Sequence, residues 1–244
     1  MTRFFITPQE LSADPILLTG QNFNHAKVLR LKAGEQVLVC DGQNAECLCA
    51  VEAVLEEQMV LSVLERRQAS SEAAVRVSIY MAFPKADKLE HVIQKATELG
   101  ACEIVAFPSG RCVSRPDNKS LAKKLERWQK IAVSAAEQSG RGRIPAILAL
   151  ASFDEAVKRA AQTDLPLLFY ENERTCSMRS SFSGRVFSSA AVMTGPEGGL
   201  TQREVQTAAD LGMTICSLGP RILRCETAPL CALTALLYES GDLD

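Results

Sequence analysis

Histidine is scarce in this chain of 244 residues, which contains only His25 and His91. The nine cysteines are an odd number, and no two of them have the C-x-x-C spacing of a zinc or redox motif. A zinc site would need ligands from distant segments, and a disulfide scaffold is disfavoured. We therefore expect no metal site, and reduced cysteines that pack as small apolar side chains.

Long apolar runs are absent as well. No run approaches the roughly 18 residues that mark a membrane-spanning helix. The N-terminal residues MTRFFITPQELS lack the apolar core of a signal peptide. These absences predict a cytoplasmic protein without a membrane partner. The composition, with 47% apolar and 23% charged residues, is ordinary for a globular protein.

Two phosphate-binding signatures of nucleotide enzymes are also missing. The chain contains neither the dinucleotide fingerprint G-x-G-x-x-G nor the loop G-x-x-x-x-G-K-[ST]. A ligand held by a phosphate cage is therefore not supported.

The pattern of the sequence changes near Ser71. Before it, short β-type runs such as RFFI and VLRLKAGEQVLVC are separated by turn residues, which favours a small β-barrel. After it, strands and helices alternate, which predicts a mainly parallel sheet with helices on both faces. We expect two domains, residues 1–72 and 73–244. The expected strands are VRVSIYMAF, EIVAF, PLLFY, AAVMT and TICSL, and the expected helices lie within 85–99, 119–139, 154–161, 201–212 and 228–238.

Charge is unevenly distributed, although the net charge is only −2. Residues 1–72 carry a net charge of −4, whereas residues 111–143 hold nine Lys or Arg against three acidic residues. A local basic stripe can hold the phosphates of a nucleic acid. A solvated helix face would have the same composition, so the charge pattern leaves both interpretations open.

Two glycine-bearing loops follow expected strands, at Gly195–Gly199 and at Gly219–Glu226. Ligands of an open parallel sheet collect at the carboxyl ends of its strands, and glycine lets the backbone approach them closely. An ordinary tight turn is the alternative for each loop taken alone. A zwitterionic ligand with an adenine ring fits best, since the loops offer backbone amides and the apolar Leu218, Ile222 and Leu223.

Five motifs together resemble one known family. TGPEGGLTQREV, LGPRILRCETA, DKLEHVIQKATELG, AAEQSGR and HAKVLRLKAGE occur in the order expected of the RsmE family of 16S ribosomal RNA methyltransferases, in the SPOUT superfamily. The resemblance implies a PUA-like β-barrel, followed by an α/β SPOUT domain with a C-terminal deep trefoil knot, and a homodimer. It also implies S-adenosylmethionine-dependent methylation of N3 of one uridine in 16S rRNA, as naked RNA or within the small ribosomal subunit. The cofactor contacts expected under this interpretation are Thr194, Gly195, Glu197, Gly198, Gly199, Leu218, Gly219, Ile222, Leu223 and Thr227.

Methylation of uracil N3 requires loss of a proton and stabilisation of the resulting charge on the carbonyl oxygens. Arg224, in the second loop, is the expected catalytic cation, since a planar guanidinium can bind a carbonyl of the developing anion. Glu226 is the expected base, or the residue that holds Arg224 in place. A structural ion pair between these two residues is the alternative, and Glu197 is the competing carboxylate.

Other residues are expected to bind the RNA. Phosphate contacts are predicted for basic side chains, and Gln138 of the EQSGR turn is predicted to touch sugar or base edges. His25 reads equally well as a structural histidine. A non-catalytic ribosome-assembly factor, or a SPOUT enzyme that acts on another RNA, remains an alternative function. The predicted RNA-binding residues are Arg30, Arg111, Arg115, Lys123, Lys124, Gln138, Arg141 and Arg143.

Overall fold

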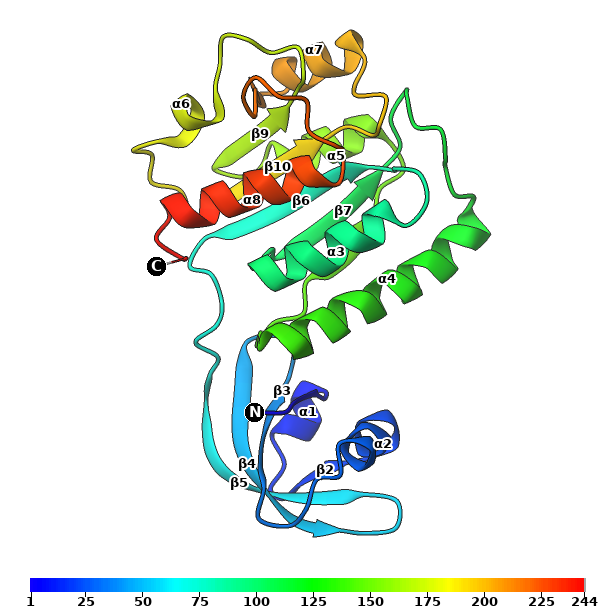
Figure 1. The fold of residues 1–244 in the computed structure, drawn as a ribbon, viewed down its shortest axis with the longest axis vertical. Helices are drawn as coiled ribbons and strands as arrows, with labels where there is room; N and C mark the ends of the chain where they lie inside the picture. The colour runs from blue at the N-terminus through cyan, green and yellow to red at the C-terminus, as the bar shows by residue number, and fades with distance from the viewer. Residues whose placement is uncertain (244) are drawn as a thin grey trace. The chain divides into compact units, whose positions relative to one another are not determined.

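A computed structural model describes residues 1–243, which form two compact units (Figure 1). The first unit consists of Met1–Glu72 and Ala136–Ile144. The second unit consists of Ala73–Ala135 and the chain from Pro145 onward. The sequence places a boundary after residue 72, but its periodicity gives no sign that residues 136–144 return to the first unit.

The first unit is built around an open, half-barrel sheet of five strands in the order β1-β3-β4-β5-β2. The β1–β3 pair is parallel and the other pairs are antiparallel. The concave core contains Phe4, Ile16, Val39 and Leu61, all fully buried. The strands are β1 (Arg3–Phe5), β2 (Ile16–Leu18), β3 (Gln36–Cys40), β4 (Ala45–Val54) and β5 (Met59–Gln68).

Two helices of this unit, α1 (Pro8–Leu11) and α2 (Gly20–Val28), are not expected from the sequence. A capping box between Thr7 and Glu10 starts α1, with Pro8 in its first turn. The β-type interpretation of VLRLK is wrong, because Val28 ends α2 and Arg30 adopts a left-handed conformation, with φ of 56°. Only two residues of α2 are buried, so no apolar period marks the helix.

The second unit contains a six-stranded sheet in the order β11-β9-β10-β6-β7-β8, in which every pair is parallel. The predicted parallel sheet is therefore confirmed. The four-residue β8 is missing from the sequence-based expectation, since it is too short to show a pattern. The strands are β6 (Arg76–Ala82), β7 (Glu103–Phe107), β8 (Ala146–Ala149), β9 (Leu165–Phe169), β10 (Ser189–Thr194) and β11 (Thr214–Cys216).

Helices cover both faces of this sheet (Figure 1). The helices α3 and α8 pack against each other, and α8 contacts β6 and β10, whereas α5 and α7 pack together on the opposite side. Gly100 ends α3 in a left-handed conformation, and the predicted capping box of Thr201 and Glu204 starts α7. The helices are α3 (Lys88–Leu99), α4 (Asn118–Ser139), α5 (Phe153–Ala160), α6 (Met178–Phe182), α7 (Gln202–Asp210) and α8 (Thr227–Glu239).

The C-terminal trefoil knot stays a prediction that rests on the family resemblance. Knots are too rare in proteins to be expected on general grounds. Within residues 1–243, none of the helices combines the length and the apolar character that crossing a bilayer requires.

Candidate functional site

A cavity of about 590 Å³ lies at the carboxyl ends of three neighbouring strands of the second unit. Its walls are three loops, which follow β9, β10 and β11. This is the position at which an open parallel sheet collects a ligand. Two of the three loops are the glycine-bearing segments that the sequence singled out.

The cavity brings together nine of the ten residues expected to bind the cofactor. Thr227 is the exception, since it follows the lining segment as the first residue of α8. Ile222 is 81% exposed, so its side chain is an open apolar surface on the cavity wall. The nine lining residues are Thr194, Gly195, Glu197, Gly198, Gly199, Leu218, Gly219, Ile222 and Leu223.

The loop after β10 is shaped by close backbone packing. A Cβ atom on Gly195 would lie 3.0 Å from the carbonyl carbon of Gly199, so a side chain there would push the loop apart. Gly199 has φ of 68°, a conformation that side-chain-bearing residues rarely adopt. The hydroxyl of Thr194 is buried and finds no hydrogen-bond partner among residues 1–243. A buried hydroxyl on a cavity wall is a polar group that a ligand can satisfy.

The loop after β9 is a third wall that the sequence reasoning missed. Tyr170, Glu171 and Arg174 line the cavity. The Glu171 carboxylate packs against Gly199, since a Cβ there would lie only 2.4 Å from Oε1 of Glu171. Arg174 donates from Nη1 to the carbonyl oxygen of Glu171 at 2.7 Å. The sequence contains a signal for this loop, because the charge-rich segment ENER follows the strand PLLFY just as GPEGG follows the strand AAVMT.

Arg224 and Glu226 do not form the predicted pair. Arg224 is exposed and lines the cavity, whereas Glu226 is absent from the lining. The ion pairs found within residues 1–243 include Glu226 with Lys88 and do not include Arg224. The expectation that Glu226 holds Arg224 is therefore wrong, because the carboxylate faces α3 instead.

Lys88 is another charged residue of this region that the sequence reasoning did not single out. Its ammonium lies 3.0 Å from Oε1 of Glu197 and 3.2 Å from Oε2 of Glu226. The hydrogen bonds that the ammonium donates, first to Glu197 and then to Glu226, raise the pKa of Lys88. Burial alone would raise the pKa of Glu226, but hydrogen bonds from its own amide, Cys225 and Lys88 lower it. A carboxylate with a lowered pKa is a weak general base.

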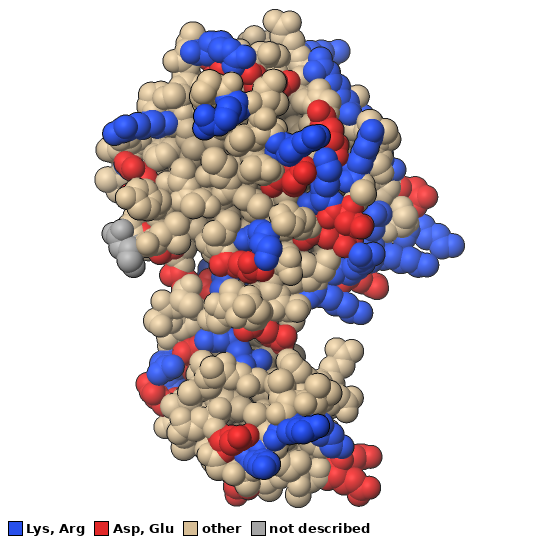
Figure 2. Space-filling model, in the orientation of Figure 1, with Lys and Arg blue, Asp and Glu red and all other residues tan. Residues whose placement is uncertain are grey.

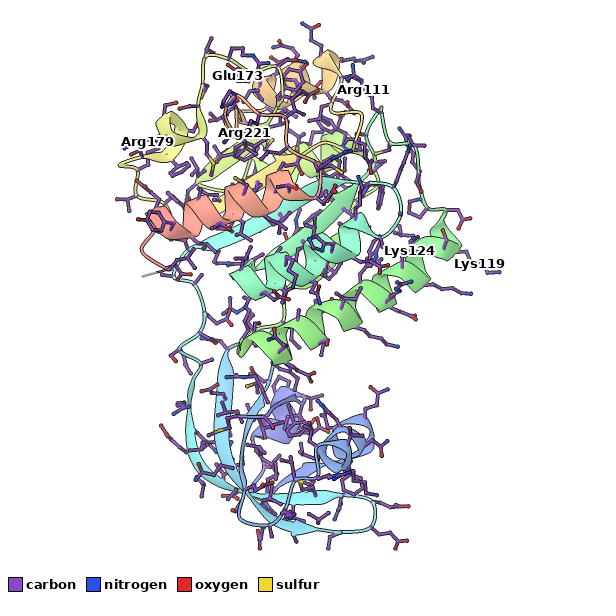
Figure 3. The ribbon with its side chains drawn as sticks, viewed as in Figure 1. Arg111, Lys119, Lys124, Glu173, Arg179 and Arg221 are labelled. Atoms are coloured by element: carbon purple, nitrogen blue, oxygen red, sulfur yellow. The ribbon has the colours of Figure 1, made fainter. Side chains whose placement is uncertain are left out.

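The basic residues expected to bind RNA have several different environments in the second unit. Arg111 donates from Nη1 to the carbonyl oxygen of Gly198 at 2.9 Å, which ties it to the cavity loop. Arg115 hydrogen-bonds the carbonyl oxygen of Ser109. Lys123 and Lys124 are exposed on α4, where Figures 2 and 3 show basic side chains gathered around the start of the helix. Together, these four side chains form a basic surface that extends from residue 111 to the first turns of α4.

The remaining expected RNA contacts lie in the first unit. Arg30 and Gln138 are exposed, and Arg143 is half-buried. Arg141 is only 3% exposed, and its Nη2 lies 2.6 Å from Oε2 of Glu72. The prediction that Arg141 binds phosphate is therefore wrong for this conformation, because a buried guanidinium already holds a carboxylate.

Within residues 1–243, no group of three or more His, Cys, Asp or Glu residues is placed to hold a metal ion. The cysteines of this part of the chain are free thiols, five of them buried, namely Cys40, Cys47, Cys49, Cys216 and Cys225.

Comparison with known proteins identifies the family. The profile of the RNA methyltransferase domain matches residues 71–237, and that of the RNA methyltransferase PUA domain matches residues 18–64. Ribosomal RNA small subunit methyltransferase E of Bacillus subtilis (strain 168) is 38% identical over 249 residues, which cover 98% of this chain and 97% of that protein. The chain belongs to the ribosomal RNA small subunit methyltransferase E family.

Solved structures of similar proteins agree with this family. Ribosomal RNA small subunit methyltransferase E from Neisseria gonorrhoeae, bound to S-adenosyl methionine, is 30% identical with a TM-score of 0.85, and the match covers 98% of this chain and 97% of that one. A methyltransferase from Legionella pneumophila in complex with the same cofactor is 29% identical with a TM-score of 0.84, with coverage of 98% and 97%. The predicted α/β methyltransferase domain preceded by a PUA domain is confirmed.

Proposed function

We propose that this protein transfers a methyl group from S-adenosylmethionine to N3 of a specific uridine in 16S rRNA. The observation that carries the proposal is the cavity at the strand ends, which is lined by three loops in a chain of the ribosomal RNA small subunit methyltransferase E family. Two similar proteins have structures with S-adenosylmethionine bound. The choice of N3 and of uridine comes from the family resemblance of the five sequence motifs.

The residues of the cavity fit this cofactor. The unpartnered hydroxyl of Thr194 and the glycine backbone of the loop after β10 offer polar contacts without a phosphate cage. Leu218, Ile222 and Leu223 offer apolar surface for an adenine ring. When bound, the cofactor supplies an electrophilic methyl group. The role of the chain is to hold donor and acceptor in line, which can supply much of the acceleration.

Arg224 is the residue that acts on the uracil in this proposal. Its exposed side chain at the cavity leaves the guanidinium available to hydrogen-bond a carbonyl oxygen as negative charge develops there. Glu226 has a bracing role instead of the role of base, since its carboxylate is held by Lys88 and its pKa is lowered. The N3 proton therefore passes to solvent water at the open cavity, and the Arg224 guanidinium stabilises the anion that remains.

The RNA is bound in this proposal by both units. Arg115, Lys123 and Lys124 contact phosphates, while Arg111 also steadies the cavity loop through Gly198. Arg30 and Gln138 are the corresponding exposed residues of the first unit. We further propose that residues 1–72 act as the RNA-binding domain and residues 73–244 as the catalytic domain. A cytoplasmic homodimer completes the proposal.

The test is mass mapping of small-subunit rRNA from cells with and without the gene for this protein. We expect the loss of one N3-methyluridine, and its return when the wild-type gene is restored. An unchanged modification pattern would exclude the proposed substrate. Calorimetry with S-adenosylmethionine distinguishes the enzyme from the assembly-factor alternative. Binding supports the enzyme, whereas an assembly factor would not need to bind the cofactor.

A further inference from the structure

The two cavity loops that carry Glu197 and Glu226 are both tied to the start of α3. Lys88 is the first residue of α3, and its one ammonium contacts both carboxylates, at 3.0 Å and 3.2 Å. The Lys85 amide also donates to Glu197, at 3.0 Å to Oε1. The Lys88 side chain thus contacts residues that lie 109 and 138 positions away from it in the sequence.

We propose that Lys88 is a positioning residue for the cofactor cavity, which holds the loop after β10 and the loop after β11 in their binding-competent arrangement. The proposal rests on the proposed function in naming S-adenosylmethionine as the ligand. Lys88 is absent from the cavity lining, so it acts through Glu197 and Glu226.

The charge balance explains why the lysine is needed. Two carboxylates share one ammonium, and each side chain is about a quarter exposed: 28% for Lys88, 24% for Glu197 and 26% for Glu226. Without the ammonium, two like charges would face each other in a partly desolvated place, where repulsion is weakly screened. The loops would then separate, and the cavity between them would lose its shape.

Glu226 also occupies a key position in the backbone. It is the N-cap residue of α8, and its side chain makes no capping hydrogen bond. Its carboxylate accepts hydrogen bonds from Lys88 and from the Cys225 thiol instead, the latter at 3.2 Å. Lys88 therefore connects the start of α3 to the start of α8 and, through Glu197, to the cavity wall formed by residues 195–199.

The first experiment measures hydrogen exchange of the backbone amides in the ligand-free protein. Lys88→Met is expected to speed exchange in residues 195–201 and 217–226, while the β-strands of the second unit keep their protection. The matched control is Lys95→Met, which removes a half-exposed lysine of the same helix that pairs only with its neighbour Glu98 in the described contacts. Equal exchange of the two loops in both variants would overturn the proposal.

The second experiment measures the affinity for S-adenosylmethionine by calorimetry. Lys88→Met is expected to weaken binding about ten-fold, in line with the loss of a partly buried charge partner. Lys88→Arg should recover most of the affinity, and Lys95→Met should bind as the wild type does.

The double variant Lys88→Met with Glu226→Gln distinguishes charge repulsion from general destabilisation, since a second destabilising substitution would not restore binding. Removing the second charge relieves the repulsion, so the double variant should bind more tightly than Lys88→Met alone. Weaker binding by the double variant would refute the charge-balance mechanism. Absence of binding by the wild type would refute the proposed function, and the exchange experiment would still decide whether Lys88 holds the loops.

Discussion

Substitution of Gly142 by alanine should destabilise the first unit through a clash that no side-chain rotation can relieve. A Cβ atom at this position would lie 2.2 Å from the Cβ atom of Ala69. Ordinary carbon contacts are about 3.5–4.0 Å, so the two backbone segments must separate by roughly 1.5 Å. Three hydrogen bonds resist this movement: Ala69 N to Asn44 O, Asn44 N to Gly142 O, and Gly142 N to Oε1 of Glu72.

The magnitude follows from this steric conflict. Overpacking of a closely packed site costs about 1–3 kcal/mol. For a unit of this size, each kcal/mol lowers the Tm by about 4–8 °C. Scanning calorimetry of the full chain should show this decrease in the transition of the first unit, with little change in that of the second.

A compensating substitution makes the test specific. Ala69→Gly removes the atom that the new methyl group meets, so Gly142→Ala should be far less harmful in that background. Gly140→Ala is the control for backbone strain, because Gly140 has φ of 75° and open space around it. An unchanged Tm for Gly142→Ala, or no rescue by Ala69→Gly, would refute the reasoning.

Three further predictions concern the second unit. Arg224→Ala should lower kcat at least about 100-fold with little effect on cofactor affinity, as measured by single-turnover kinetics and calorimetry, if the guanidinium stabilises the developing anion. Hydrogen bonds from Thr175 and Cys176 lower the pKa of Glu173 to about 2 from an ordinary value of 4.5. The resulting stabilisation is complete above about pH 4.5 and is lost as the pH falls toward 2, so thermal unfolding should separate Glu173→Gln from the wild type only at the higher pH. Replacing Lys123 and Lys124 by alanine should reduce the slope of log affinity for RNA against log salt by about 0.7–0.9 per lost phosphate contact, while Lys158→Ala on α5 leaves it unchanged.

Most of the second unit could be predicted because its helices and strands are long enough to show an apolar period. The helix that begins at Lys88, for example, buries Leu89, Val92, Ile93 and Ala96 on one face. The short α1 and α2 could not be predicted in this way. A capping box starts α1, whereas α2 has no side-chain cap, and so few of their residues are buried that neither helix shows an apolar period.

The glycine loops of the candidate site could be located from the sequence, because a tight turn with positive φ after a strand favours glycine. The sequence alone left an ordinary turn open for each loop. Their charged partners could not. Lys88 contacts Glu197 and Glu226 only through the tertiary fold, and no residue near it in the sequence indicates either contact. The same reason explains the mistaken role for Arg141, whose partner Glu72 is 69 residues away.

The return of Ala136–Ile144 to the first unit has a consequence for how this protein can be divided or recombined. No single cut separates the two units, since a fragment ending at residue 72 lacks the backbone groups that bind Glu72. A fragment starting at residue 73 keeps the buried Arg141 without its carboxylate. Exchange of the first unit between relatives therefore requires two grafts, and gene fusions of either unit alone would produce an incomplete fold.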